Sequence, residues 1–201
     1  MADLGFLTAR PIAHRGLHDG NLARWENTAS AFDAAVARDF SIELDVQLSA
    51  DGVAMVFHDD TLDRLTDRKG PVAAWRAAAL AALPVGGTAD KIPTLADTLA
   101  RVGGRVPVVI EMKDNGARNN DLARAVAQDL AGYGGPAAVM SFEQDLIAAF
   151  AGTGSPVPVG SSASHAASCA AAAVRTALHS PWPSPASGAS HADPLLFRWV
   201  T

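Results

Sequence analysis

The sequence is short of several features that would point to particular classes of protein. Its 201 residues contain a single cysteine, Cys169, so no internal disulfide can form. Basic residues do not outnumber acidic ones, and the net charge of -5 gives no sign of a nucleic-acid partner or of an anionic membrane surface. The oligomeric state stays open.

Long apolar runs are also lacking. No stretch of about 18 apolar residues is present, and the first residues, MADLGFLTARP, have neither a basic start nor an apolar core. We therefore expect no transmembrane segment, no signal peptide and a cytoplasmic location. Hydrophobic residues at 49% and charged residues at 18% fit a globular protein, and the length suffices for one domain with a core.

Short apolar runs alternate with Ala-rich helical patterns along most of the chain, and this alternation indicates a parallel sheet with helical crossovers. The expected strands are 11–14, 41–48, 53–58, 106–113, 137–142 and 156–160. The expected helices are 27–39, 72–83, 94–102, 120–133 and 143–152.

The pattern changes after Gly160. The segment 161–193 is rich in Ala and Ser and has turn and loop chemistry over much of its length. Within the last 41 residues only CAAAAVRTAL, 169–178, is typical of a helix and LLFRWV, 195–200, of a strand. Truncation, a shifted reading frame and a partner chain that closes the sheet are alternative explanations for this composition.

Polar side chains gather on strands that should otherwise be apolar. Glu43 and Asp45 lie two residues apart in SIELDVQL and so share one face, although like charges on one face repel. Glu111 and Lys113 share a face in VVIEMK in the same way. In parallel α/β folds the carboxyl ends of the strands carry the active site, which is a ready explanation for such residues.

The three carboxylates, Glu43, Asp45 and Glu111, form a set of hard oxygen ligands. Such ligands suit Mg²⁺ or Ca²⁺ better than Zn²⁺, and a bound cation would remove the repulsion between Glu43 and Asp45. Two structural alternatives remain open at this point. A solvated edge-strand face for Glu43 and Asp45 on the second expected strand, and simple pairing of Glu111 with Lys113, are the less favoured alternatives.

Two histidines and two fixed cations accompany the carboxylates. His14 ends the first expected strand and His58 the third, and because an imidazole ordinarily titrates near neutrality, one is able to act as a base and the other as an acid. Arg15 and Lys113 offer positive charge for an anionic substrate. A metal ion, two histidines and two cations suit displacement at a phosphodiester.

Six short motifs occur in order between about residues 11 and 142: AHRG, ENT, ELDVQ, VFHDDTLDRLT, IPTL and IEMK. Together they resemble the motif set of the glycerophosphodiester phosphodiesterase family. The resemblance implies a TIM-type (β/α) barrel and metal-dependent hydrolysis of glycerophosphodiesters to an alcohol and sn-glycerol 3-phosphate. It also implies that the segment at about 59–92 is a short insertion near the barrel mouth.

The resemblance assigns roles to individual residues. The implied metal ligands are Glu43, Asp45 and Glu111, for Mg²⁺ or Ca²⁺. The implied catalytic pair is His14 and His58, and our interpretation favours His14 as the base and His58 as the acid. Arg15 and Lys113 are implied phosphate contacts. For Glu26, in the ENT motif, a substrate-site role and a simple helix-start carboxylate are equally compatible with the sequence.

A complete barrel usually needs about 250 residues, so we expect this one to be incomplete at its C-terminus. The expected domain division is a barrel core over 1–160 and an atypical segment over 161–201. All motif residues precede that segment. Two alternative functions stay open: a non-catalytic or damaged family member that binds metal or a phosphate ligand, and a lyase that forms a cyclic phosphate.

Overall fold

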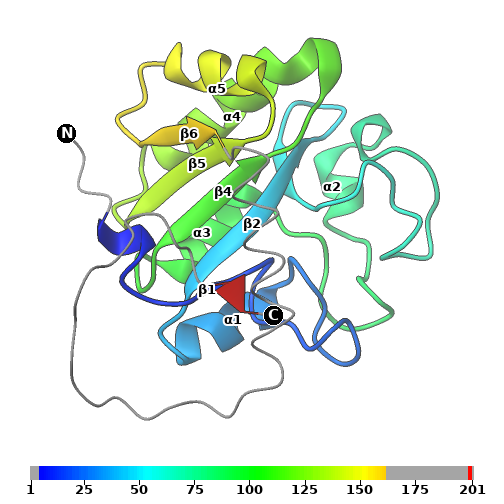
Figure 1. Ribbon diagram of the computed structural model, residues 1–201. Coiled ribbons are helices and arrows are strands. Elements are labelled where there is room, and N and C mark those ends of the chain that lie inside the picture. Colours follow the sequence, from blue (N-terminus) through cyan, green and yellow to red (C-terminus); the bar gives the residue numbers. More distant parts are fainter. Residues whose placement is uncertain (1–4, 162–198, 201) are drawn as a thin grey trace, which may run out of the picture.

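A curved, mostly parallel β-sheet is the centre of the molecule in the computed structural model, which describes residues 5–161 and 199–200 (Figure 1). The strand order is β6-β5-β4-β2-β1-β7, and β3 pairs with β2 outside this path. The strands are β1 Ile12–Ala13, β2 Ser41–Leu48, β3 Ala54–Val56, β4 Val108–Met112, β5 Ala137–Ser141, β6 Val159–Ser161 and β7 Trp199–Val200.

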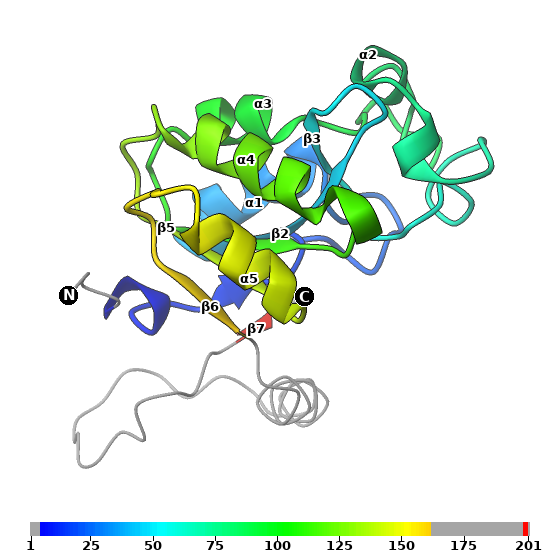
Figure 2. The same ribbon diagram turned by 90° about the horizontal axis from the view of Figure 1, so that it is seen from above.

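The longer helices lie together on one side of the sheet (Figure 2). They are α1 Ala29–Ala37, α3 Leu95–Val102, α4 Asn119–Leu130 and α5 Gln144–Ala151. The short α2, Ala77–Leu80, belongs to a separate lobe, residues 59–92, beside the carboxyl end of β2 (Figure 1). Three 3-10 turns are η1 Gly5–Leu7, η2 Val72–Ala74 and η3 Gly116–Arg118. Within the described ranges, no helix has the length and apolarity needed to cross a membrane.

Strand β2 shows why the site lies where it does. Ile42, Leu44 and Val46 are fully buried in the core between the sheet and the helices. Their alternation with polar residues follows from the period of two along a strand. Glu43 and Asp45 therefore point to the opposite face of the sheet, away from the helices.

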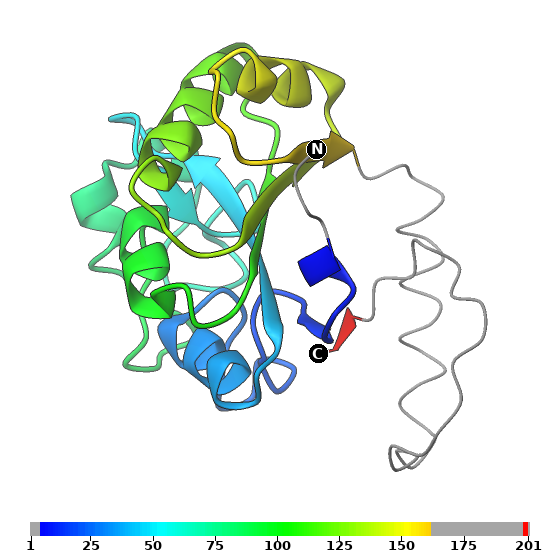
Figure 3. The same ribbon diagram turned by 90° about the vertical axis from the view of Figure 1, so that its left-hand side faces the viewer.

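The sheet curves from β6 at one edge to β1 and β7 at the other (Figure 3). Among the strands that the structure describes, β6 pairs only with β5 and β7 only with β1, so the ring of strands is not closed. The parallel order with helical crossovers confirms the expected α/β fold of barrel type. The expected helix at 169–178 and most of the strand at 195–200 lie outside the described residues.

Two details differ from the sequence-based expectation. The segment 53–58 is not a further parallel strand, because β3 forms an antiparallel hairpin with β2. The expected helix at 72–83 is also wrong, since it divides into η2 and α2 around an extended Trp75. The carbonyl of Trp75 accepts from the Ala50 backbone N–H at 2.8 Å, and the Asp51 carboxylate accepts from the Ala77 N–H at 2.8 Å. These tertiary contacts outweigh helix propensity.

Candidate active site

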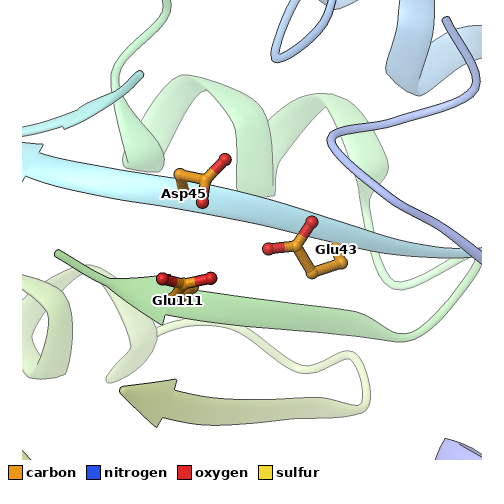
Figure 4. Close-up of side chains that lie close together, drawn as sticks. All are labelled: Glu43, Asp45 and Glu111. Carbon is orange, nitrogen blue, oxygen red and sulfur yellow. The ribbon is translucent and has the colours of Figure 1, made fainter. Parts of the chain in front are cut away.

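Three carboxylates from two neighbouring strands form the centre of the site (Figure 4). Glu43 and Asp45 come from β2 and Glu111 from β4, and the parallel register places Asp45 directly beside Glu111. One oxygen of each carboxylate lies within 4.8 Å of the others, and all three residues are buried. The structure thus brings together the three residues that the sequence marked as cation ligands.

The electrostatics of this cluster favour a bound cation. Burial, with the nearby Asp45 carboxylate, raises the pKa of Glu43 well above its usual value, and burial also raises the pKa of Glu111. Glu43 Oε1 is buried and has no hydrogen-bond partner among the described residues. A buried carboxylate oxygen without a partner is costly, and a hard divalent cation would both coordinate it and offset the repulsion. The residues present therefore fit such an ion.

Two cationic side chains border the carboxylates. The Lys113 ammonium forms an ion pair with Asp45 Oδ1 at 2.9 Å and also pairs with Glu111. Burial alone would lower the pKa of Lys113, but the two carboxylates raise it above its usual value. Arg15 Nε lies 3.5 Å from Asp45 Oδ2. Both cations therefore lie at the site, and Lys113 keeps its charge at neutral pH.

The turn after β1 places Arg15 and Gly16 in left-handed backbone conformations. Arg15 has a positive φ of 57°, and its backbone N–H donates to Glu43 Oε2 at 2.9 Å. Gly16 follows with a φ of 78°, and a Cβ at this position would lie 2.9 Å from the Cβ of Ala31 on α1. The His-Arg-Gly sequence is thus explained locally, because only glycine fits this turn against α1.

His14 lies at the end of β1, with Nε2 4.0 Å from Glu43 Oε2. Burial and the neighbouring Arg15 guanidinium lower its pKa to about 4. The imidazole is therefore neutral at neutral pH and is able to accept a proton.

The antiparallel β3 returns His58 to the level of the carboxylates. The Phe57 backbone N–H donates to the Asp45 carbonyl at 3.0 Å, and Gln47 Nε2 donates to the His58 carbonyl at 3.1 Å. The His58 ring is held at Nδ1 by Asp59 Oδ1 at 2.8 Å. His58 is thus brought to the expected site by a hairpin rather than by a parallel strand.

Glu26 does not belong to the cluster of three carboxylates but contacts Arg15, which borders it. Its buried carboxylate accepts from Arg15 Nη1 at 2.8 Å and from both terminal nitrogens of Arg64 at 2.7 and 2.9 Å. It also accepts from the side-chain amide of Asn21. The N-cap position of α1 belongs to Thr28, and Glu26 lies behind Arg15.

Four contributors to the site were not singled out from the sequence: Asn27, Gln47, Asp59 and Arg64. Asn27 has a positive φ of 56°, and its side-chain amide donates to Asp45 Oδ2 at 2.8 Å. Its place in the ENT motif was a usable signal, and Gln47 shares the face of Glu43 and Asp45. Arg64 carried no such signal, because its position depends on how the segment after β3 folds.

The fold and this cluster define an α/β protein of the TIM-barrel class whose carboxylates, at the carboxyl side of the sheet, suit a divalent cation. A family model described as the glycerophosphoryl diester phosphodiesterase family matches residues 14–176. The chain belongs to this family.

Curated relatives and solved structures agree with this assignment. YhdW of Bacillus subtilis (strain 168) is 39% identical over 109 residues, covering 51% of this chain and 44% of that protein. A phosphodiesterase from Oleispira antarctica, solved in complex with the product sn-glycerol-3-phosphate, has a TM-score of 0.70 at 25% identity, over 77% of this chain and 66% of that one. A glycerophosphodiester phosphodiesterase from Agrobacterium tumefaciens str. C58 has a TM-score of 0.63 at 30% identity, over 75% and 65%.

The match is partial in length. The chain spans less than half of YhdW, and the glycerophosphodiester phosphodiesterase of Caldanaerobacter subterraneus subsp. tengcongensis is likewise matched over 44% of its length, at 37% identity across 110 residues and 51% of this chain.

Proposed function

We propose that the protein hydrolyses glycerophosphodiesters to an alcohol and sn-glycerol 3-phosphate, with Mg²⁺ or Ca²⁺ as cofactor. The observation that carries this proposal is the buried cluster of Glu43, Asp45 and Glu111, with the unpartnered Glu43 oxygen. These three residues would hold the cation, which when bound supplies positive charge for the phosphoryl oxygens. Membership of the family supports the reaction class.

Two histidines serve as general acid and base in this proposal. His14 is neutral at neutral pH, so it is suited to accept the proton of the attacking nucleophile. His58 acts in its imidazolium form: Asp59 accepts from Nδ1–H, and the proton on Nε2 passes to the leaving oxygen. This assignment agrees with the interpretation drawn from the sequence and stays a proposal.

Substrate binding is assigned to the cations beside the cluster. Arg15 and Lys113 contact the phosphate and neutralise its charge. Glu26 contributes through Arg15, whose guanidinium it holds at 2.8 Å. The sn-glycerol-3-phosphate bound in the Oleispira antarctica structure supports a glycerophosphate substrate.

The cytoplasmic location and the division of the chain at residue 160 stay predictions from the sequence.

The test is product analysis over a panel of diesters. Purified protein is incubated with glycerophosphocholine, glycerophosphoethanolamine and glycerophosphoglycerol in Mg²⁺ or Ca²⁺, and the products are followed by phosphorus NMR. We expect sn-glycerol 3-phosphate as the phosphorus-containing product. A cyclic phosphate would show a lyase instead. Calorimetric cation binding without turnover of any diester would show a non-catalytic binder.

A further inference from the structure

Arg64, in the loop after β3, makes two paired contacts with carboxylates. Its two terminal nitrogens donate to the two oxygens of Glu26 at 2.9 and 2.7 Å. Nε and one terminal nitrogen donate to the two oxygens of Asp59 at 2.7 and 2.8 Å. A planar guanidinium is the side chain that can hold two carboxylates in fixed orientation in this way. Although the Arg64 side chain is 45% exposed, all three of its nitrogens are engaged.

Each of these carboxylates continues to a residue of the proposed site. Asp59 holds Nδ1 of His58 at 2.8 Å, and Glu26 holds Arg15 at 2.8 Å. Arg64 therefore links the proposed acid and a proposed phosphate contact, which follow two different strands, β3 and β1. Its own charge touches neither the three carboxylates of that cluster nor the histidine.

The lobe that carries Arg64 has its own apolar core. Leu62 and Leu65, on either side of Arg64, are buried in a cluster with Met55 and Phe57. Gly86 lies so close to the ring of Trp25 that a Cβ would be 1.9 Å from it, which packs the lobe against the turn before α1. Arg64 thus projects from a packed support and not from a free loop.

We propose that Arg64 is a positioning residue that keeps Asp59 on Nδ1 of His58 and Glu26 on Arg15. With a carboxylate accepting at Nδ1, the neutral ring keeps its proton on Nδ1, so the proton that makes it an imidazolium is bound at Nε2. That Nε2 proton is the one His58 donates to the leaving oxygen, and Asp59 keeps Nε2 directed at the substrate. A carboxylate that fixes the tautomer of a catalytic histidine is the arrangement known from the Ser-His-Asp triad. The proposal rests on the function proposed above, and it adds the source of the alignment of His58 and Arg15.

A purely structural role for Arg64 predicts different behaviour from a positioning role. If Arg64 only docks the lobe, its loss lowers stability and leaves the ring of His58 unchanged. If Arg64 positions Asp59 and Glu26, its replacement shifts the His58 tautomer and lowers turnover even in protein that stays folded. The ring nitrogens of histidine report the tautomer directly by nitrogen NMR, and this reading needs no substrate.

The experiment compares four forms of the protein: wild type, Arg64→Lys, Asp59→Asn and Arg68→Lys. Arg64→Lys keeps the positive charge but loses the planar guanidinium that contacts both Glu26 and Asp59. Asp59→Asn removes the carboxylate at His58 and leaves the contact between Arg64 and Glu26. Arg68→Lys is the matched control, because Arg68 lies in the same lobe, is 57% exposed and has only a 3.7 Å ion pair with Asp67. The His58 signals are assigned by their loss in His58→Ala.

We expect the neutral form of His58, observed at about pH 8, to carry its proton on Nδ1 in the wild type and in Arg68→Lys. Arg64→Lys and Asp59→Asn should show a mixed or inverted tautomer, with kcat lower by about tenfold or more, since small misplacements of a catalytic group are costly. Only Arg64→Lys should also raise KM, through Arg15. The melting curve of each variant establishes that it is folded.

A wild-type His58 with its proton on Nε2 would overturn the proposal. So would an unchanged tautomer and a kcat within about twofold in both folded variants. If Arg64→Lys fails to fold, Asp59→Asn still decides the claim at His58. A wild type that hydrolyses no diester would contradict the proposed function alone, because the ring-nitrogen spectra still show whether Arg64 and Asp59 set the His58 proton.

Discussion

Asp45 is the residue at which the parts of the site meet. It lies beside Glu111 in the sheet register, accepts from Asn27 at 2.8 Å and pairs with Lys113 at 2.9 Å. Arg15 Nε lies 3.5 Å from its Oδ2, the oxygen that also accepts from Asn27. A carboxylate with so many donors is held in one orientation, which is what a preorganised cation ligand requires.

The two histidines give a prediction at the same scale. His14→Ala and His58→Ala should each lower kcat for a glycerophosphodiester by about 10² or more, the usual contribution of a positioned acid or base. Both side chains are about one-third exposed, so the melting temperature should change little. His18→Ala, in the same turn as His14, is the control and should keep wild-type turnover. Near-normal turnover in either test variant would refute that histidine's role.

Asn27 gives a second prediction for single residues. Asn27→Ala removes the amide that donates to Asp45 Oδ2 at 2.8 Å. It also places alanine, which tolerates this conformation less well than asparagine, at a φ of 56°. We expect weaker cation binding, by about tenfold, as is usual when a partner of a metal ligand is lost. Isothermal calorimetry with Mg²⁺ or Ca²⁺ measures this. Unchanged affinity in folded protein would show that Asn27 does not orient Asp45.

At the scale of elements, the alternation in SIELDVQL predicted both the bounds of β2 and the face that carries the carboxylates. That success is physical, because a period of two assigns every second side chain to one face. The hairpin direction of β3 and the break at Trp75 were not predicted. Both depend on contacts between segments, such as the 2.8 Å bond from Ala50 to Trp75, that no local pattern contains.

The ion pairs of Arg64 with Glu26 and Asp59 should lose their stabilising effect in acid. Hydrogen bonds from Arg64 lower the pKa of Asp59, and although burial alone would raise the pKa of Glu26, Arg64 and Asn21 lower it well below its usual range. A carboxyl group with a depressed folded-state pKa stabilises the fold above its unfolded-state pKa of about 4, and this stability is lost as the pH falls through the folded-state pKa.

We therefore expect the free energy of unfolding to fall below about pH 4.5, with about 1 kcal/mol from this network, a modest value because Arg64 is 45% exposed. Urea denaturation at pH 6 and pH 3 measures the change. Arg64→Gln should reduce the difference between the two pH values, and the control Arg68→Gln should not. Equal acid sensitivity in the two variants would contradict the account.

At the scale of the whole molecule, the sheet has an open side. Among the described strands β6 pairs only with β5, and an unpaired edge is able to add a strand from another chain. We expect association that increases with protein concentration, measured by sedimentation. Ser161→Lys places a charge at an exposed position of this edge and should weaken the association. A monomer at every concentration, with or without the lysine, would show that the edge is covered.

The cation dependence of hydrolysis tests the central claim most directly. Protein treated with EDTA should release no sn-glycerol 3-phosphate from its best diester, and titration with Mg²⁺ or Ca²⁺ should restore the rate. Glu43→Gln, which removes one of the three clustered carboxylates, should need far more cation or stay inactive. Hydrolysis that continues in EDTA, or that Glu43→Gln recovers at the same cation concentration as the wild type, would contradict a cation site at Glu43, Asp45 and Glu111.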